Sequence, residues 1–252
     1  MLSARKEKQG IPALLQTALD LILPPRCIAT GEIVDAPGMV TPAFWSELAF
    51  IESPFCTTCG LPFSFEAPFG TLCAACIDLE PLFDRARSAV VYNDASRKLI
   101  IDFKYGDRLH FAQTFAPWMS RAGAALLEEA DFIVPVPLHA RRLWLRRFNQ
   151  SAVLAQELAK RSGKACLPDG LIRLRHTVQQ KGLSRQHRTD NVKNAFAVNG
   201  RCMNMMKGRN VLLIDDVFTS GATLNECART LKKRGAAQVF VLTIARVTRD
   251  EF

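Results

Sequence analysis

The distribution of apolar and polar residues divides the chain near residue 83. Before that point Gly, Pro and Phe punctuate short runs that have no clear period. After it, apolar runs typical of strands alternate with segments in which apolar residues recur at helical spacing. This alternation favours an α/β domain with a largely parallel sheet. We therefore predict two domains, residues 1–83 and residues 84–252.

The second part of the chain supplies the elements of this α/β domain. The predicted strands are Ala86–Tyr92, Asp131–Val136, Asn210–Ile214 and Gln238–Ala245. The predicted helices are Asp94–Lys104, Phe111–Glu129, Ala152–Arg161 and Ala222–Arg234. Pro117 should break the second of these helices. Gly235 should end the last one, because glycine readily adopts a positive φ. We find no internal repeat.

The N-terminal segment is the best candidate for a targeting signal. Ile11–Leu23 places apolar side chains on one face at helical spacing, and Pro24 and Pro25 would stop such a helix. Polar residues interrupt the segment, which disfavours a signal peptide. No stretch reaches the roughly 18–20 apolar residues that span a bilayer. We therefore expect an amphipathic helix, no membrane span and a cytoplasmic protein.

The charge of the chain is concentrated in one segment. The composition permits a packed core, because 48% of the residues are hydrophobic, and the formal net charge is +9. Residues 138–190 contain twelve Lys and Arg against three Asp and Glu, so this segment holds the whole excess. Such a concentration favours an anionic partner, either phosphate groups or nucleic acid.

Four of the eight cysteines are spaced like the ligands of one metal ion. They form two C-x2-C pairs with thirteen residues between them: Cys56, Cys59, Cys73 and Cys76. Four thiolates complete a tetrahedral Zn²⁺ site with no open position, so we predict a structural zinc. Redox-active or merely buried cysteines are the alternatives. Cys27 is followed by Thr30 where a further pair would need a cysteine, and an unpaired buried thiol is the favoured interpretation.

The most informative segment is Asn210–Thr223, with the sequence NVLLIDDVFTSGAT. An apolar strand there runs into two acidic residues, and a short loop leads into a helix. Asp215 and Asp216 could accept hydrogen bonds from two neighbouring ribose hydroxyls. A phosphate would be bound at the helix N-terminus by the backbone N–H groups of Thr219, Ser220, Gly221, Ala222 and Thr223. The threonine and serine side chains would add hydroxyl donors. An ordinary strand-to-helix turn and a metal-binding Asp pair are the alternatives.

This segment resembles the phosphoribosyl-pyrophosphate signature of type I phosphoribosyltransferases. The order of the sequence blocks is similar to that of the ComF family over about residues 23–246. After the cysteine pairs these blocks are residues 131–142, 146–150, 182–194 and the signature. The resemblance implies an α/β fold, a type I phosphoribosyltransferase-like parallel sheet flanked by helices. A small four-cysteine zinc-ribbon domain would precede it.

The resemblance also implies roles for residues outside the signature. The loop after the strand at 132–136 corresponds to the pyrophosphate loop, where Arg141 and Arg142 would neutralise the leaving diphosphate. Residues 180–194 resemble a mobile hairpin that closes over the substrate and brings in the positive charges of Lys181, Arg185 and Arg188. Mg²⁺ would arrive with phosphoribosyl pyrophosphate and keep several of its waters.

The sequence departs from the family pattern in one basic segment. The family commonly has R-G-F-N-Q where this chain has Arg146-Arg-Phe-Asn-Gln150, so Arg147 replaces a glycine. Trp144 and Phe148 lie among these arginines and would suit stacking on single-stranded bases, although core positions or hinge anchors are the favoured interpretation. Lys104 and its neighbours are placed equally well near the site or on the surface.

Three functions compete at this point. The first is an enzyme that transfers a phosphoribosyl group to an unknown nitrogen acceptor. The second is an accessory protein of competence and DNA uptake, which senses the ligand and binds single-stranded DNA without turnover. The third is a scaffold that binds a protein partner through the zinc ribbon. No segment is identified as a base-recognition hood, which disfavours an ordinary salvage enzyme.

Overall fold

A computed structural model of the protein describes five parts of the chain. These are residues 23–105, 108–139, 143–144, 147–175 and 190–248. The helix predicted at Ile11–Leu23 lies outside them except for its last residue. Within the described parts, no helix is long and apolar enough to cross a membrane.

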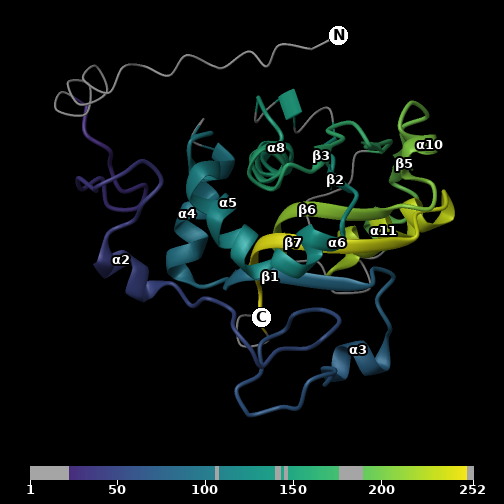
Figure 1. The fold of residues 1–252 in the computed structure, drawn as a ribbon, viewed down its shortest axis with the longest axis horizontal. Helices are drawn as coiled ribbons and strands as arrows, with labels where there is room; N and C mark the ends of the chain where they lie inside the picture. The colour runs from purple at the N-terminus through teal and green to yellow at the C-terminus, as the bar shows by residue number, and fades with distance from the viewer. Residues whose placement is uncertain (1–22, 106–107, 140–142, 145–146, 176–189, 249–252) are drawn as a thin grey trace, which may run out of the picture.

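A five-stranded parallel sheet organises the molecule (Figure 1). Its order is β1-β7-β6-β2-β3. The strands are β1 (Arg85–Val91), β7 (Gln238–Arg246), β6 (Asn210–Phe218), β2 (Phe132–Pro135) and β3 (Ala165–Cys166). A separate antiparallel pair is formed by β4 (Leu171–Arg173) and β5 (Phe196–Val198). The parallel sheet predicted from the alternating pattern is confirmed.

The two faces of the sheet belong to two apolar clusters. Leu212 and Ile214 of β6 pack with the helices of one face, which are α4 (Asp94–Tyr105), α5 (Phe111–Ala122), α6 (Ala124–Glu129) and α8 (Gln150–Ser162). Val211 and Leu213 pack in the second cluster. That cluster also contains α11 (Ala222–Lys233), α10 (Met203–Met206) and the four predicted zinc ligands. Successive strand residues therefore alternate between the faces, as the pleat requires.

The prediction that Pro117 breaks a helix is wrong. Helix α5 continues through Pro117 to Ala122, and the break falls at Gly123, between α5 and α6. A β-carbon added to Gly123 would lie 2.7 Å from a methyl carbon of Leu242 in β7. The close approach of the chain to the sheet therefore selects glycine, and Pro117 is accommodated within a helix whose side chains are largely buried.

The cysteine-rich segment contains two short helices, of which α3 (Ala74–Asp78) lies below the sheet in Figure 1 and α2 (Pro42–Glu47) lies to its left. The N–H of Ala86 in β1 donates to the carbonyl of Thr58 at 2.7 Å. A β-carbon at Gly60 would lie 2.7 Å from the carbonyl oxygen of Ala86. Gly60 has φ +69, so both its conformation and its contact with the sheet favour glycine. The boundary predicted at residue 83 stays a prediction.

Candidate functional site

A cleft of about 590 Å³ lies at the carboxyl ends of β2 and β6. Ligands of open α/β sheets commonly bind at this edge. The cleft is lined by Val136–Leu138 after β2, by Asp215–Val217 of β6 and by Thr219 and residues 221–224 of the loop and α11. Ser220, alone among the predicted substrate-binding residues, is not part of this lining. Its buried hydroxyl makes no hydrogen bond within the described part of the chain.

The two acidic residues of the signature lie on the strand itself. β6 extends to Phe218, four residues beyond the predicted end of the strand. The Asp215 carboxylate accepts hydrogen bonds from the backbone N–H of Asp216 at 2.9 Å and from the hydroxyl of Ser151 in α8 at 3.0 Å. Asp216 forms an ion pair with Lys104, in which Nζ and Oδ2 are 2.9 Å apart. The adjacent carboxylates are thus held by α8 and α4 respectively.

Burial raises the pKa of Asp215 to about 7, and the charge of Asp216 adds to the shift. The hydrogen bonds from Asp216 and Ser151 and the charge of Lys104 oppose it. A shift of this size is common at functional sites, because they bring like charges together away from water. Asp215 therefore changes its charge near neutral pH.

The loop between β6 and α11 has the geometry expected of a phosphate site. Gly221 has φ +75 and caps α11, and its carbonyl accepts the N–H of Asn225 at 2.8 Å. A β-carbon at Gly221 would lie 2.8 Å from a ring carbon of Phe218. Free backbone N–H groups at a helix N-terminus favour an anion. The predicted helix at Ala222–Arg234 is confirmed as α11, which ends one residue earlier.

Several residues of the cleft were not assigned by the sequence. Ser151 and the side chains of Tyr92, Arg97 and Arg173 carry no recognisable motif, and only the fold brings them here. Lys104 was left between two placements, and the structure puts it in the site. The N-cap side chain of Asn149, which accepts the N–H of Ser151 at 3.1 Å, fixes the start of α8.

The five basic residues predicted to act on the diphosphate all lie outside the described residues. They are Arg141, Arg142, Lys181, Arg185 and Arg188. Leu138, which precedes the first of them by three positions, lines the cleft. Their assignment stays a prediction.

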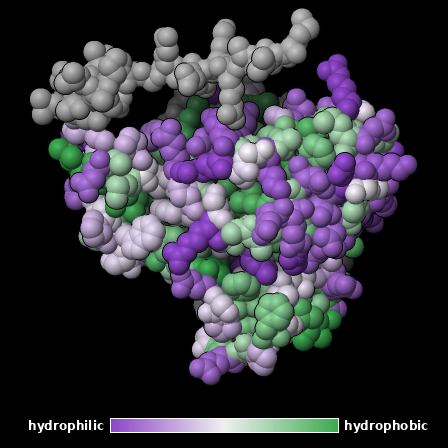
Figure 2. Space-filling view, in the orientation of Figure 1, coloured by the Kyte–Doolittle hydropathy of each residue, from purple (hydrophilic) through white to green (hydrophobic). Residues whose placement is uncertain are grey.

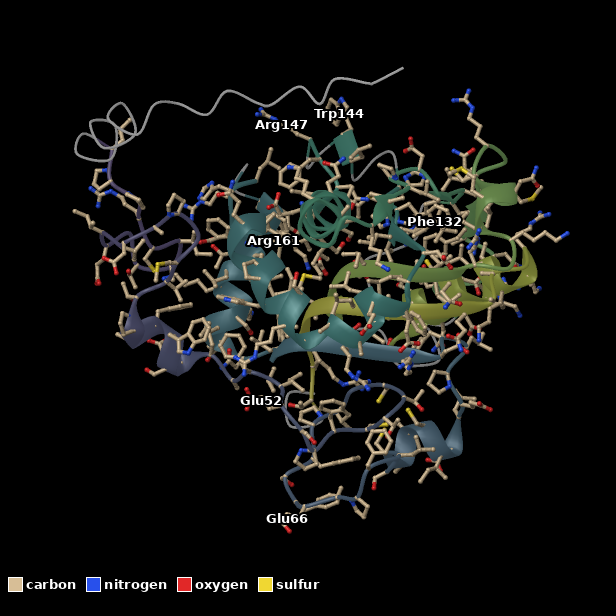
Figure 3. The ribbon with its side chains drawn as sticks, viewed as in Figure 1. Glu52, Glu66, Phe132, Trp144, Arg147 and Arg161 are labelled. Carbon is tan, nitrogen blue, oxygen red and sulfur yellow. The ribbon has the colours of Figure 1, made fainter. Side chains whose placement is uncertain are left out.

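The basic segment around Arg147 departs from the core interpretation at one residue. Trp144 is 83% exposed, so a core position is wrong for it and its role as a hinge anchor stays a prediction, whereas the ring centroid of Phe148 lies 6.1 Å from that of Phe103. Trp144 and Arg147 lie at the end of the molecule opposite Glu66 (Figure 3). Arg147 has φ +65, so the chain keeps the left-handed conformation that glycine adopts most readily.

The four cysteines predicted to bind zinc converge. Their sulfur atoms lie within 4.8 Å of one another, and all four residues are buried. Burial raises the pKa of Cys59 to about 11, and the guanidinium of Arg246 opposes this shift. Burial also raises the pKa of Cys76, whereas hydrogen bonds from the backbone of Cys59 and Cys73 outweigh burial and lower the pKa of Cys56 to about 7. Four convergent sulfurs fit a tetrahedral Zn²⁺ ion, which would tie both knuckles together.

The segment before this cluster has the same backbone hydrogen bonds as the cluster itself. In the turn at Cys27, the N–H of Gly31 donates to the carbonyl of Cys27 at 2.9 Å, and the N–H of Cys27 donates to Glu32 at 2.8 Å. The same two bonds recur at Cys56, each at 2.8 Å, from Gly60 and to Leu61. The isolated bridges match as well, Arg26 with Ile33 and Phe55 with Pro62.

The second halves of the two units also correspond. The N–H of Thr41, at the start of α2, lies 3.5 Å from the Cys27 sulfur. The N–H of Cys73, at the start of α3, lies 3.3 Å from the Cys56 sulfur. The sequence therefore contains an internal repeat, and the prediction that it has none is wrong. The repeat is hard to recognise in the sequence because only one of the four corresponding positions in the first unit is a cysteine.

The first unit does not fit a metal ion. The positions that correspond to the four cysteines hold Cys27, Thr30, Thr41 and Phe44. Phe44 is 5% exposed and belongs to the apolar core, so a phenyl ring lies where the fourth ligand would be. Among the described residues, the only group of sulfur, imidazole or carboxylate ligands that converges on one point is the second unit. The parts of the chain that the structure describes thus hold one complete set of four ligands for a zinc ion.

The ribbon also exposes large apolar side chains. Figure 2 shows apolar surface on the part of the molecule below the sheet. The most exposed large apolar residues of this part are Phe65, Phe69, Ile77 and Leu79.

Comparisons with known proteins agree with this architecture. A model of the double zinc ribbon domain matches residues 18–77, and a model of the phosphoribosyl transferase domain matches residues 149–251. Orotate phosphoribosyltransferase from Aeropyrum pernix has a TM-score of 0.34 and 16% identity, over 63% of this chain and 80% of that one. The two family models together show that a zinc ribbon precedes a phosphoribosyltransferase-like domain in this chain.

Relatives that match most of the chain identify its family. Competence protein F of Haemophilus influenzae is 34% identical over 77% of this chain and 85% of its own length. DNA utilization protein YhgH of Escherichia coli K12 is 32% identical over 77% and 85%. Competence protein ComFC of Bacillus subtilis is 31% identical over 80% and 81%. The chain belongs to the ComF family.

Proposed function

We propose that the cleft binds phosphoribosyl pyrophosphate with Mg²⁺ and that the protein transfers the phosphoribosyl group to a nitrogen acceptor. The observation that carries this proposal is the meeting of two elements in one cleft. Asp215 and Asp216 lie near the carboxyl end of β6, beside a loop that leads to the N-terminus of α11. Neighbouring carboxylates suit the two hydroxyls of a ribose, and the helix N-terminus suits its 5′-phosphate.

The residues divide the work by position. Asp215, oriented by Ser151, and Asp216, paired with Lys104, would hold the ribose hydroxyls. Thr219 to Thr223 would bind the 5′-phosphate. The diphosphate would then extend toward Leu138, and Arg141 and Arg142 follow it in the sequence. The bound Mg²⁺ would supply positive charge to the phosphate oxygens while keeping several waters.

The reaction breaks the bond between C1 of the ribose and the diphosphate oxygen, and a nitrogen of the acceptor forms the new bond to C1. Positive charge develops on the sugar while the diphosphate leaves with the bonding electrons. Fixed cations near the departing group and exclusion of water are the effects that accelerate such a step. Closure of residues 180–194, with Lys181, Arg185 and Arg188, would supply both.

Calorimetric titration with phosphoribosyl pyrophosphate and Mg²⁺, followed by an assay for released diphosphate, tests the proposal. Binding should be abolished in Asp215→Ala/Asp216→Ala. Binding should be unchanged in Asp78→Ala/Glu80→Ala, which removes two exposed carboxylates of the ribbon and its linker. Wild-type affinity in the first double variant would refute the site. Diphosphate release that depends on an added acceptor would establish an enzyme.

A second candidate function is the binding of single-stranded DNA without turnover. The exposed indole of Trp144, next to a basic segment, favours it, because bases stack on aromatic side chains between cations. Names of relatives refer to competence and DNA utilization. An oligonucleotide should then quench tryptophan fluorescence, and Trp144→Ala should lose the quenching. Ligand binding without diphosphate release would favour this function over transfer.

Two further assignments belong with these proposals. The exposed apolar residues of the ribbon would suit a protein partner. The absence of a spanning helix in the described parts leaves a cytoplasmic location as a prediction.

A further inference from the structure

Buried side chains connect the zinc site to the loop between β6 and α11 (residues 219–221), called here the phosphate loop. The first of these side chains is that of Arg246. Arg246 is the last residue of β7 and is 7% exposed. One guanidinium nitrogen donates to the carbonyl oxygen of Cys59 at 2.7 Å, and another lies 3.2 Å from the Cys59 sulfur. The strand that ends in Arg246 belongs to the central sheet, whereas Cys59 belongs to the ribbon. Arg246 therefore links the two parts of the molecule.

The other face of the same guanidinium lies on Phe218. Its central carbon is 4.1 Å from the ring centroid of Phe218. Phe218 is the last residue of β6, is 5% exposed, and pairs in register with Arg246. The Phe83 ring packs edge-on against it, with centroids 5.8 Å apart. Phe218 is thus held between the arginine that contacts the zinc ligand and a residue of the segment after the ribbon.

Phe218 in turn supports the phosphate loop. The Gly221 α-carbon lies so close to the ring that an added β-carbon would be 2.8 Å from one of its carbons. A displacement of the ring would therefore move the backbone that presents N–H groups to the phosphate. A second connection runs beside the first. The N–H of Leu82 donates to the side chain of Asn225 at 2.7 Å, and the Asn225 N–H donates to the Gly221 carbonyl.

Charge gives the metal a part in this arrangement. Four thiolates around Zn²⁺ leave the site negatively charged, and Arg246 is the buried cation that contacts one of the sulfurs. A guanidinium is held more strongly by a thiolate than by a neutral thiol, because the opposite charges attract each other. Binding of the metal would therefore fix the guanidinium, and the guanidinium would fix the ring beneath the loop.

We propose that zinc binding and ligand binding are thermodynamically coupled through Arg246 and Phe218, which act as positioning residues for the phosphate loop. The coupling rests on the proposed binding of phosphoribosyl pyrophosphate. Because coupling is reciprocal, zinc should strengthen ligand binding, and the ligand should strengthen retention of zinc by the same factor.

Arg87 provides a matched control for Arg246. Arg87 lies in β1, the strand that pairs with β7, and its guanidinium donates to the carbonyl of Thr57 at 3.0 Å. Its guanidinium lies over Phe55, 4.4 Å from the ring centroid, instead of over Phe218. Both arginines thus attach the sheet to the same knuckle through a backbone carbonyl. Arg246 alone of the two packs on the ring that supports the phosphate loop.

The test measures ligand affinity by calorimetry in full-length, zinc-loaded protein with phosphoribosyl pyrophosphate and Mg²⁺. Arg246→Met should weaken binding about tenfold, a typical coupling factor, whereas Arg87→Met should change it less than about twofold. Elemental analysis should find one zinc per chain in both variants. Equal affinity of Arg246→Met and wild type would overturn the coupling.

The reciprocal measurement is made on the wild-type protein, with Arg246→Met as its control. Saturating ligand should slow the transfer of zinc from wild-type protein to a chromogenic chelator about tenfold. The same ligand should have no effect on zinc transfer from Arg246→Met, which controls for binding of zinc by the ligand itself. Ligand-independent release from wild type would overturn the coupling even if the proposed function holds. Absence of ligand binding in wild type would instead remove the proposed function and the coupling with it.

Discussion

At the scale of single residues, the signature gains its chemistry from neighbours that are remote in the sequence. Asp215 is buried beside Asp216, and burial with this like charge raises its pKa to about 7. Ser151 and Lys104 come from two different helices and stabilise the charged forms of the pair. A sequence motif supplies two carboxylates, but their protonation depends on what the fold places around them.

Ligand affinity should therefore depend on pH through Asp215. Only the ionised carboxylate accepts hydrogen bonds from both ribose hydroxyls, so affinity should rise about tenfold between pH 6 and pH 8 as Asp215 ionises around pH 7. The raised pKa has the opposite effect on stability. Since the folded state keeps a proton that the unfolded state has lost, the free energy of unfolding should fall as pH rises from about 4 to about 7.

Asp215→Asn is the control for this pH profile. It keeps the shape of the side chain and removes the titrating group, so the pH dependence that remains belongs to the phosphates of the ligand. Calorimetry at several pH values measures both profiles. Parallel profiles for Asp215→Asn and wild type would contradict the assignment of the titration to Asp215.

Arg147 tests the cost of a left-handed residue. Its φ is +65, a conformation that costs a residue with a β-carbon about 1–2 kcal/mol relative to glycine. Arg147→Gly should raise the free energy of unfolding by up to about 1 kcal/mol, because the greater flexibility of unfolded glycine offsets part of the gain. Arg147→Ala keeps the β-carbon and should give no gain. Chemical denaturation compares the three proteins, and a destabilised glycine variant would contradict the prediction.

At the scale of elements, the strand β6, its loop and α11 form one unit whose geometry is fixed at Gly221. The apolar run predicted the strand and the terminal Gly235 predicted the end of the helix. The contact of Gly221 with Phe218 could not be predicted, because it depends on how the loop folds back over the end of the strand.

Gly221→Ala should weaken ligand binding strongly and lower the free energy of unfolding only moderately. The added methyl group would meet the Phe218 ring at 2.8 Å in a residue with φ +75, so the loop must move. The cost in unfolding free energy should be about 1–2 kcal/mol, while affinity falls at least tenfold. Gly163→Ala is the matched control, because Gly163 has φ +71 but open space at its β-carbon. Equal losses of affinity in the two variants would contradict this explanation.

The two ribbon units share one backbone structure, although only the second has four cysteines. The turn at Cys27 keeps the hydrogen bonds of the turn at Cys56, with Gly31 at φ +78 and Gly60 at φ +69. In the first unit, the burial of Phe44 against the core and the bond from Thr41 to Cys27 hold together what zinc would hold in the second. Apolar burial thus stabilises the first unit, where a metal ion would stabilise the second.

The purified chain should therefore contain one zinc ion. Thr30→Cys/Thr41→Cys/Phe44→Cys restores the four-cysteine pattern in the first unit, and it should raise the content to two zinc ions per chain. The same triple variant with Cys27→Ser lacks the fourth thiolate and should stay at one after dialysis. Elemental analysis reports each value, and two zinc ions in the wild-type chain would contradict the assignment.

At the scale of the whole molecule, the ribbon is part of the architecture that shapes the cleft. The four clustered cysteines pack in the same apolar cluster as Val211, Leu213 and α11. Arg246, Phe218 and Asn225 carry contacts from this cluster to the phosphate loop. The zinc site and the cleft therefore depend on the same layer of side chains, although they lie at different places in the sequence.

The sequence by itself determined the parts of this protein that depend on local pattern. The spacing of apolar residues and the positions of glycine and proline predicted β1, β2, β6, β7 and α11 to within a few residues, since strand and helix faces follow from that spacing. Cysteine spacing predicted which four sulfurs converge, because a knuckle is a local turn. The acidic pair and the loop at 219–223 located the candidate site for the same reason.

The tertiary structure decided what depends on contacts between distant segments. It placed Lys104 on Asp216 and Ser151 on Asp215, moved a helix break from Pro117 to Gly123, and showed that the segment at Cys27 repeats the ribbon unit with a single cysteine. It also laid Arg246 between Cys59 and Phe218. Such contacts join residues up to 187 positions apart, and no local spacing encodes them. They arise when packing of the sheet brings these side chains together.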